Sequence, residues 1–336
     1  MSRTNMTNEK LLVIMGPTSS GKSSLAIEIA KRWNGEIISA DSRQVYRGMD
    51  IGTGKVKRDP QSPTTHYQLL TTHSEGIPHH LLDVADPNDD YNISHFLHDA
   101  KMAIEDISHR EKLPIICGGT GFWIQALIEN QELPNIPPDP LLREELSKKT
   151  PEELFEMFKT LDPERANTID GKNPRRLVRA IEIVRNQNKE LGIKNGASKI
   201  PHSSFSIPHS LLLALCPPKD ILDAKIKVRL DARFDEGMID EVTRLHTEGV
   251  SWERLDAFGL EYRWISRYLR NSISERNMKE RLLFEIIHYA KRQMTWIRRW
   301  QRKNPDLHIV ETPEEAMRLV REFLEKENCS ESLPNS

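Results

Sequence analysis

The chain has 336 residues, 37% of them hydrophobic and 29% charged, which is typical of a soluble globular protein of about two domains. Its 48 lysines and arginines nearly balance its 50 aspartates and glutamates, so the net charge of −2 does not indicate a uniformly basic nucleic-acid-binding protein. The three widely spaced cysteines argue against a disulfide framework and a zinc site. The polar N-terminus is unlike a signal peptide and no apolar run could span a bilayer, so we expect a cytoplasmic protein without membrane contact.

The first part of the chain alternates short apolar strands with helices. KLLVIM at 10–15 is a largely apolar run before a turn, as in buried parallel strands. Similar strands are predicted at 35–41 and 113–121. This rhythm predicts an α/β fold, with a parallel sheet flanked by helices and ligands bound at the carboxyl ends of the strands. The loop after the first strand, Asp41 and the turn at 118–121 should therefore lie together.

The middle of the chain has a different character. A proline-rich segment, LPNIPPDP, is followed by TPEE at 150–153, a capping box with proline at the first helical position. NP at 173–174 begins another helix with apolar residues along one side. We predict a small helical insert domain at 135–210.

The strand predicted at 211–216 returns the chain to the sheet. The α/β core domain is therefore predicted to comprise residues 10–134 and 211–324, and the polar tail at 325–336 is expected to be disordered. The long helices predicted after the last strand lie at about 219–247, 261–270 and 275–303.

The segment GPTSSGKS after the first strand matches the phosphate-loop pattern G-x-x-x-x-G-K-[ST], between a strand and a helix as the pattern requires. Its backbone N–H groups and the helix N-terminus attract an anion, Lys22 can reach the outer phosphate oxygens, and Ser23 can hold Mg²⁺. GTGK at 52–55 has a weaker similarity, but no strand precedes it and no helix follows, which favours an ordinary loop. The predicted phosphate-binding residues are Gly16, Pro17, Thr18, Ser19, Ser20, Gly21, Lys22 and Ser23.

Other candidates have two interpretations each. Asp41 could hold Mg²⁺ or accept a proton, or it could simply begin a turn. Thr120 lies between glycines, where it could donate to an anion or cap a helix. Lys225, Arg229 and Arg233 are spaced i, i+4, i+8, a pattern that usually marks a solvated face, although a diphosphate would justify one inward arginine.

Two basic segments stand out on this nearly neutral chain. NPRRLVRA lies in the insert, and HYAKRQMTWIRRWQRKN at 288–304 mixes cations with aromatic residues. Such segments suit a polyanion with exposed bases, held between core and insert. The alternative for 288–304 is an amphipathic helix whose Met294, Trp296, Ile297 and Trp300 face the core, and the two interpretations are compatible.

The sequence resembles the tRNA dimethylallyltransferases from about Leu11 to Trp300. Seven motifs in the family's order carry the resemblance: GPTSSGKS, ISADSRQVYRGMDIGTGK, PHHLLDVADP, CGGTGFW, NPRRLVRAIEI, RFDEGMIDEV and YAKRQMTWIRR. The resemblance implies a P-loop NTPase-like fold. It also implies transfer of a dimethylallyl group from dimethylallyl diphosphate to N6 of the adenosine just 3′ of the tRNA anticodon. The phosphate loop would then hold the leaving diphosphate, bridged by Mg²⁺ with Ser23 as a ligand.

Roles for individual residues follow from the resemblance alone. Asp41 matches the general base, Thr120 the threonine near the reacting centre, and Arg229 the arginine on the diphosphate, whereas Lys225 and Arg233 match no such role. Gln44 would lie close to the adenine. The expected partner is the anticodon stem-loop of tRNA, bound by a monomer. The residues matching tRNA contacts are Asp41, Ser42, Arg43, Gln44, Thr120, Arg143, Arg175, Arg176, Leu177, Val178 and Arg179.

Three departures from the family pattern are visible. CGGTGFW has Phe-Trp where Leu-Tyr is usual, the segment 55–78 is longer, and GLEYRWISRYL replaces Gly-Ile-Gly-Tyr-Lys-Glu around Tyr262. Three alternatives remain open from the residues: a small-molecule or nucleotide kinase, an adenylate isopentenyltransferase, and a non-catalytic RNA-binding nucleotide switch. The insert and the terminal basic segment argue against the second, because a free nucleotide needs neither.

Overall fold

The computed structural model describes residues 10–60, 71–131, 136, 138–193 and 209–325. The chain divides into two compact units. A core unit comprises residues 1–131 with 206–336, and an insert unit comprises residues 132–205. Within the described residues, no helix has the length and apolar character that crossing a membrane requires. Glu325 ends a helix, so the rest of the expected disordered tail lies outside the described residues.

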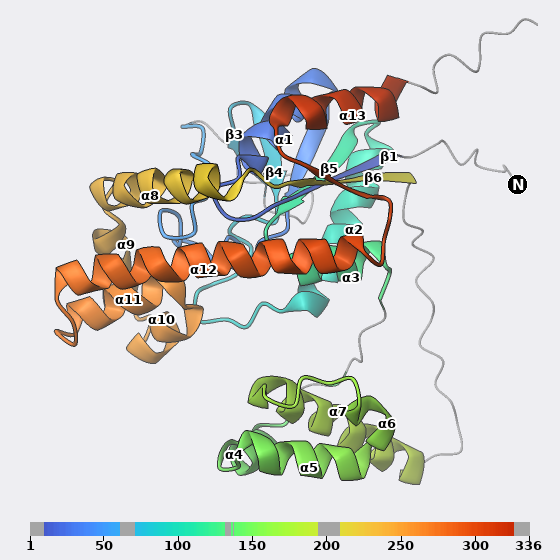
Figure 1. Cartoon of the computed structure of the whole chain (residues 1–336), viewed down its shortest axis with the longest axis vertical. Coiled ribbons are helices and arrows are strands. Elements are labelled where there is room, and N and C mark those ends of the chain that lie inside the picture. Colours follow the sequence, from blue (N-terminus) through green and yellow to red (C-terminus); the bar gives the residue numbers. More distant parts are fainter. Residues whose placement is uncertain (1–9, 61–70, 132–135, 137, 194–208, 326–336) are drawn as a thin grey trace, which may run out of the picture. The chain divides into compact units, whose positions relative to one another are not determined.

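Within the described residues, the core unit contains one seven-stranded sheet in the order β3-β4-β2-β5-β1-β6-β7 (Figure 1). Among these strand pairs only β3–β4 is antiparallel, which confirms the predicted, mainly parallel sheet. The three strands absent from the prediction, β3, β4 and β7, have four residues each and carry no long apolar run. The strands are β1 (Lys10–Met15), β2 (Gly35–Ser39), β3 (Thr71–Ser74), β4 (Ile77–His80), β5 (Leu113–Gly118), β6 (His209–Leu215) and β7 (Leu307–Val310).

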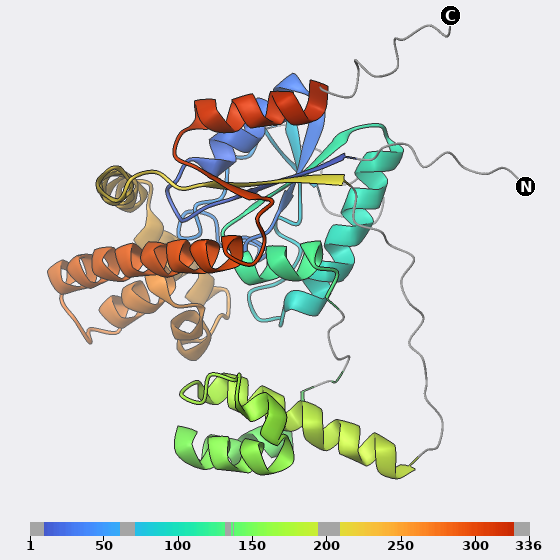
Figure 2. The same cartoon turned by 45° about the vertical axis from the view of Figure 1, so that its right-hand side comes forward.

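Helices cover both faces of the sheet (Figure 2). On one face, α1 (Lys22–Arg32) and α13 (Pro313–Glu325) bury their apolar residues against the central strands in one hydrophobic cluster. On the other face lie α2 (Ile93–His109) and α3 (Gly121–Ile128), whose apolar sides are also buried. Burial on both faces is the reason that β1 and β5 read as nearly continuous apolar runs.

The C-terminal helices differ from the prediction at one point. The single helix expected at 219–247 is wrong, because the chain breaks between α8 (Lys219–Asp235) and α9 (Met238–Thr247). Gly237 has a φ of 92°, a left-handed conformation that ends α8. The remaining helices are α10 (Trp252–Phe258), α11 (Leu260–Leu269) and α12 (Glu275–Gln301).

The insert unit is helical, and its helices begin at prolines. The capping box predicted at 150–153 is present, since Thr150 and Glu153 exchange backbone-to-side-chain hydrogen bonds of 2.8 and 3.2 Å. The apolar side of its last helix, including the fully buried Leu177 and Ile181, packs into a separate small core. The helices are α4 (Pro140–Ser147), α5 (Pro151–Leu161), α6 (Pro163–Ala166) and α7 (Pro174–Ile193).

Candidate active site

Three predicted segments meet at the carboxyl edge of the sheet. β5 lies between β1 and β2, so the turn after β5 is flanked by the phosphate loop and by the segment beginning at Asp41. The Ser42 N–H donates to Thr120 Oγ1 at 2.9 Å, and the Thr120 N–H donates to the Ala40 carbonyl at 3.2 Å. Thr120 stands at the N-terminus of α3, but its hydroxyl makes no capping hydrogen bond and instead fixes the neighbouring segment.

The phosphate loop runs from Gly16 to Gly21 and leads directly into α1. Gly21 has a φ of 98°, which glycine adopts without strain, and no side-chain hydrogen bond caps the helix start. The Lys22 ammonium donates to the Pro17 carbonyl at 3.3 Å, folding back over the loop. Burial lowers the pKa of Lys22. The arrangement places a helix N-terminus and a half-buried cation side by side, which suits a phosphate group.

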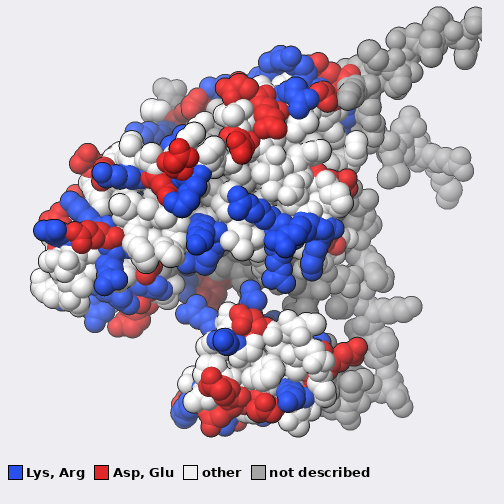
Figure 3. Space-filling model, in the orientation of Figure 1, with Lys and Arg blue, Asp and Glu red and all other residues white. Residues whose placement is uncertain are grey.

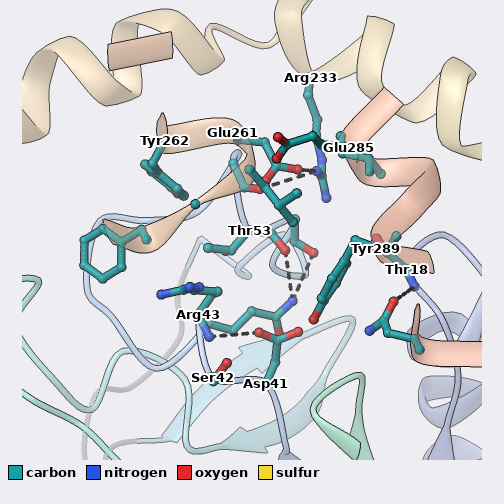
Figure 4. A pocket seen from close by; sticks show the side chains of 18 of the residues that line it. Thr18, Asp41, Ser42, Arg43, Thr53, Arg233, Glu261, Tyr262, Glu285 and Tyr289 are labelled. Carbon is teal, nitrogen blue, oxygen red and sulfur yellow. Dashed lines mark hydrogen bonds and ion pairs between the residues drawn. The ribbon is translucent and has the colours of Figure 1, made fainter. Parts of the chain in front are cut away.

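The Asp41 segment combines the turn expected from the sequence with a side chain on the cavity wall. Asp41 Oδ1 accepts the Arg43 N–H at 2.9 Å, so the carboxylate does begin a turn. It also lines a cavity of about 370 Å³, where the hydroxyl end of Tyr289 points toward it (Figure 4). Burial, and then the Asp41 charge, raise the pKa of Tyr289. The Gln44 amide donates to the Thr53 and Gly54 carbonyls at 3.3 and 3.4 Å.

A second cavity opens on the other side of the phosphate loop. It measures about 640 Å³, and its wall includes Ala224 and Val228 of α8. Val228 is 70% exposed, so this wall presents apolar surface beside a charged loop. The two cavities share four lining residues, which mark where they adjoin: Lys22, Ser23, Gly54 and Arg229.

The arginines of α8 do not form the solvated stripe that their spacing usually marks. Arg229 donates to the Gly54 carbonyl at 2.9 Å, and burial followed by repulsion from Arg233 lowers its pKa to about 10. Arg233 is buried and pairs with Glu261 at 3.0 Å. Of the three cations, Lys225 alone is exposed, as a residue on a solvated helix face should be.

The turn at 49–54 accepts hydrogen bonds from Arg229 and Arg233 on its carbonyls, and its own N–H groups are held by Glu241. The Glu241 carboxylate accepts the N–H groups of Asp50, Ile51 and Gly52 at 2.8, 2.7 and 3.0 Å, and the Tyr262 hydroxyl at 2.8 Å. A carboxylate of the protein itself occupies these donors, so this turn, which was predicted to be an ordinary loop, binds an internal anion. Nothing in the sequence indicated that Glu241 would be that anion.

The segment around Tyr262, where the sequence departs from the family pattern, contributes buried side chains to the core unit. The Tyr262 side chain is 2% exposed and its hydroxyl is bonded to Glu241, so it presents no surface for RNA. Beside it, Glu261 is the buried partner of Arg233 on the cavity wall.

The predicted RNA-binding residues of the insert fall into two groups. Arg175 and Arg176 are exposed. Arg143 and Arg179 both pair with the buried Glu182, at 2.6 and 3.2 Å, and so contribute to the fold of the insert. Leu177 lies on the apolar side of α7 and is fully buried in the insert core, so it has no exposed surface with which to contact RNA. Val178 is half-buried.

The C-terminal half of α12 is amphipathic, as one of its two interpretations predicted, with Ile297 and Trp300 buried and Met294 and Trp296 half-buried. Binding of a polyanion by its cations stays a prediction. Trp300 is buried, and its indole N–H donates to Glu129 at 3.1 Å. Lys and Arg side chains gather on the outer surface of the same half (Figure 3). The exposed cations are Lys291, Arg292, Arg298, Arg299, Arg302 and Lys303.

A magnesium ion would have few protein ligands at this site. The described residues contain no group of three or more His, Cys, Asp or Glu side chains that could hold a metal ion. The Ser23 hydroxyl lies at the junction of the two cavities beside Lys22. This donor set fits Mg²⁺ only where substrate phosphate oxygens and water supply most of the coordination, which is the usual mode for this ion.

Comparison with known proteins adds independent observations. A family model described as IPP transferase matches residues 44–300, and one described as isopentenyl transferase matches residues 9–76. The chain is 39% identical to tRNA dimethylallyltransferase 1 of Syntrophus aciditrophicus, over 90% of this chain and 94% of that protein. It is 37% identical to tRNA dimethylallyltransferase 1 of Geotalea uraniireducens, over 94% and 96% of the two chains.

Solved structures agree with these matches. The full-length tRNA isopentenylpyrophosphate transferase of Bacillus halodurans is 29% identical, with a TM-score of 0.65 over 97% of this chain and 100% of that one. A eukaryotic dimethylallyltransferase acting on tRNA, 23% identical, shares the fold with a TM-score of 0.73 over 95% and 80% of the two chains. The predicted P-loop NTPase-like fold is confirmed.

Proposed function

Because the chain belongs to the IPP transferase family, whose matched relatives are named tRNA dimethylallyltransferases, we propose that it transfers a dimethylallyl group to tRNA. The donor is dimethylallyl diphosphate, and the acceptor is N6 of adenosine-37, just 3′ of the anticodon. The observation that carries this proposal is one cavity lined by Asp41, by Thr18, Lys22 and Ser23 of the phosphate-loop segment, and by Arg229. Thr120 adjoins the cavity through its hydrogen bond with Ser42, which lines it. The kinase alternative is not favoured, since the relatives are prenyltransferases by name.

The reaction forms the N6–C1 bond and breaks the bond between C1 and the diphosphate oxygen. A neutral aromatic amine is a weak nucleophile, so a positioned base that takes its proton contributes roughly 10²–10⁴-fold. Asp41 is that base in our proposal, because its carboxylate lies on the cavity wall beside Thr120 at the strand ends. Gln44 and Arg43, which follow it in the chain, would contact the target nucleotide.

Negative charge grows on the leaving oxygen as the C1–O bond breaks. Lys22 and Arg229 are held in place by hydrogen bonds to the Pro17 and Gly54 carbonyls, so these two cations need not reorganise during the step. Arg229 keeps its charge at neutral pH although its pKa falls to about 10. Mg²⁺ held by Ser23 and the diphosphate would neutralise further charge on the leaving group.

The two adjoining cavities suggest separate routes for the substrates. The larger one, with Ala224 and Val228 in its wall, suits the dimethylallyl chain and admits the donor. The smaller one, on the Asp41 side, receives the adenine, which must leave the base stack for its N6 atom to be reached. Diphosphate would then lie where the two meet, at Lys22 and Arg229.

The tRNA contacts in this proposal come from both units. On the core unit, the exposed cations of α12 neutralise backbone phosphates, and on the insert unit Arg175 and Arg176 do so. Binding should therefore weaken as salt concentration rises. We propose that the chain acts on the anticodon stem-loop as a monomer, in the cytoplasm where tRNA is found.

The test is prenyl transfer to a synthetic anticodon stem-loop with Mg²⁺ present. Mass spectrometry of nuclease digests should find dimethylallyladenosine at the position 3′ of the anticodon. A stem-loop with guanosine there should remain unmodified. Transfer to free AMP in place of the stem-loop would indicate the adenylate isopentenyltransferase instead, and tight RNA binding without modification would indicate the non-catalytic switch.

A further inference from the structure

One polar side chain, that of Gln293, joins two loops of the site. Gln293 of α12 accepts the Thr18 N–H on Oε1 at 2.9 Å and donates from Nε2 to the Gly119 carbonyl at 2.9 Å. Its partners are 275 and 174 residues away along the chain. Gln293 therefore bridges the phosphate loop and the turn after β5 from a third element.

The fit around this bridge is tight. A Cβ atom on Gly119 would lie 2.7 Å from Gln293 Nε2, so a side chain at position 119 would displace the amide from its present place. The helix that carries Gln293 is anchored on the same side, where the Trp296 ring lies against Gly121 and Trp300 bonds to Glu129. The packing of α12 therefore fixes the position of the Gln293 amide relative to the two loops.

The bridge stands between the two groups that the reaction must align. On one side, Thr18 belongs to the loop that holds the leaving diphosphate in the proposed function. On the other side, Gly119 precedes Thr120, which accepts the N–H of Ser42, the residue after Asp41. We propose that Gln293 is a positioning residue, which fixes the distance between the leaving-group site and the general base. This inference rests on the proposed function.

The chemistry explains why a glutamine suits the position. A displacement at C1 needs the amine, C1 and the leaving oxygen in line, and a misplacement of 1 Å can cost about 10²-fold in rate. A primary amide offers an acceptor oxygen and a donor nitrogen on the same carbon of one flat group, without a change of protonation state. Glutamate keeps the acceptor for Thr18 but loses the donor for Gly119, and methionine of similar length loses both.

The test compares Gln293→Met and Gln293→Glu with the unmodified chain and with Gln301→Met, a matched change on the same helix. At saturating tRNA and donor, we expect kcat to fall by about 100-fold in Gln293→Met, while the KM for tRNA stays within about twofold. Gln293→Glu should also lose at least about tenfold in kcat. Gln301→Met should retain the original kcat.

A second readout separates positioning from loss of folded protein. In a misaligned site, water can take the place of the amine at C1, so diphosphate release should exceed prenyl transfer in Gln293→Met. Fewer folded molecules would lower both products equally, and their ratio would stay at one. An unchanged kcat, or a ratio of one in both Gln293 variants, overturns the inference. An unmodified chain that transfers nothing would instead contradict the proposed function.

Discussion

Replacing Arg233 by methionine tests whether this arginine of α8 stabilises the fold as the buried partner of Glu261. Arg233 and Glu261 are 3.0 Å apart, with side chains only 9% and 10% exposed. Arg233 also donates to the Gly52 carbonyl at 3.4 Å. Without Arg233, the Glu261 carboxylate would remain buried with no ion-pair partner at that distance.

The burial sets the expected size of the effect. Breaking a buried pair from one side costs about 3–5 kcal/mol, whereas an exposed pair contributes about 0–1 kcal/mol. Arg276 and Glu280 supply the matched control, because they are also 3.0 Å apart but 87% and 62% exposed. Arg233→Met should therefore lower the free energy of unfolding by about 3–5 kcal/mol, and Arg276→Met by less than about 1 kcal/mol. The double variant Arg233→Met with Glu261→Leu should recover most of the loss.

Urea unfolding followed by tryptophan fluorescence measures this directly, since all six tryptophans belong to the core unit. The pH dependence adds a second check. Burial raises the pKa of Glu261 and Arg233 opposes that rise, so the pKa should climb further in Arg233→Met. The loss of stability in Arg233→Met should be smallest below pH 4.5, the ordinary pKa of a glutamate. It should grow as the pH rises through the raised pKa of Glu261. A loss no larger than that of Arg276→Met, or a double variant as unstable as the single one, would refute the reasoning.

Further outcomes follow from the same contacts. Asp41→Ala should lower kcat by about 10²–10⁴-fold while tRNA binding, measured by filter retention, persists; equal loss of binding would mean that Asp41 is structural. Arg229→Ala should raise the KM for dimethylallyl diphosphate and lower kcat/KM by about 10²–10³-fold in steady-state kinetics, and an unchanged KM would move the anion contact elsewhere. Burial of Glu36 alone would raise its pKa, but Arg110, His80 and Lys112 outweigh that effect and hold the pKa far below 4.5, so its contribution to stability is present above pH 4.5 and lost as pH falls. Glu36→Gln should therefore flatten the acid side of a plot of melting temperature against pH. Chelation with EDTA should abolish transfer and added Mg²⁺ should restore it; transfer that persists would remove the metal from the account.

Much of the site could be predicted because its signals are local. The phosphate loop is a contiguous pattern between a strand and a helix, and the apolar runs of β1, β2 and β5 mark buried strands. The rule that ligands gather at the carboxyl ends of parallel strands then brought Asp41 and Thr120 together, and their segments are hydrogen-bonded through Ser42.

The rest depended on contacts between distant segments. The spacing of Arg233 on α8 is that of a solvated face, and only the packing of the turn at 49–54 buries it. Gln293 lies within a motif quoted from the sequence, but its two bonding partners are set by tertiary structure. The break at Gly237 had a signal, a glycine inside a helical pattern, and the short hairpin β3–β4 had none of comparable strength.

The central claim is that the phosphate loop holds a leaving diphosphate while carbon is transferred. The most direct measurement incubates the purified chain with unmodified tRNA, dimethylallyl diphosphate and Mg²⁺, without ATP, and counts both products in the same reaction. We expect one diphosphate to be released for each dimethylallyladenosine formed, and we expect no diphosphate to be released without tRNA. Modification that requires ATP, or a phosphorylated product in place of a prenylated one, would contradict the claim.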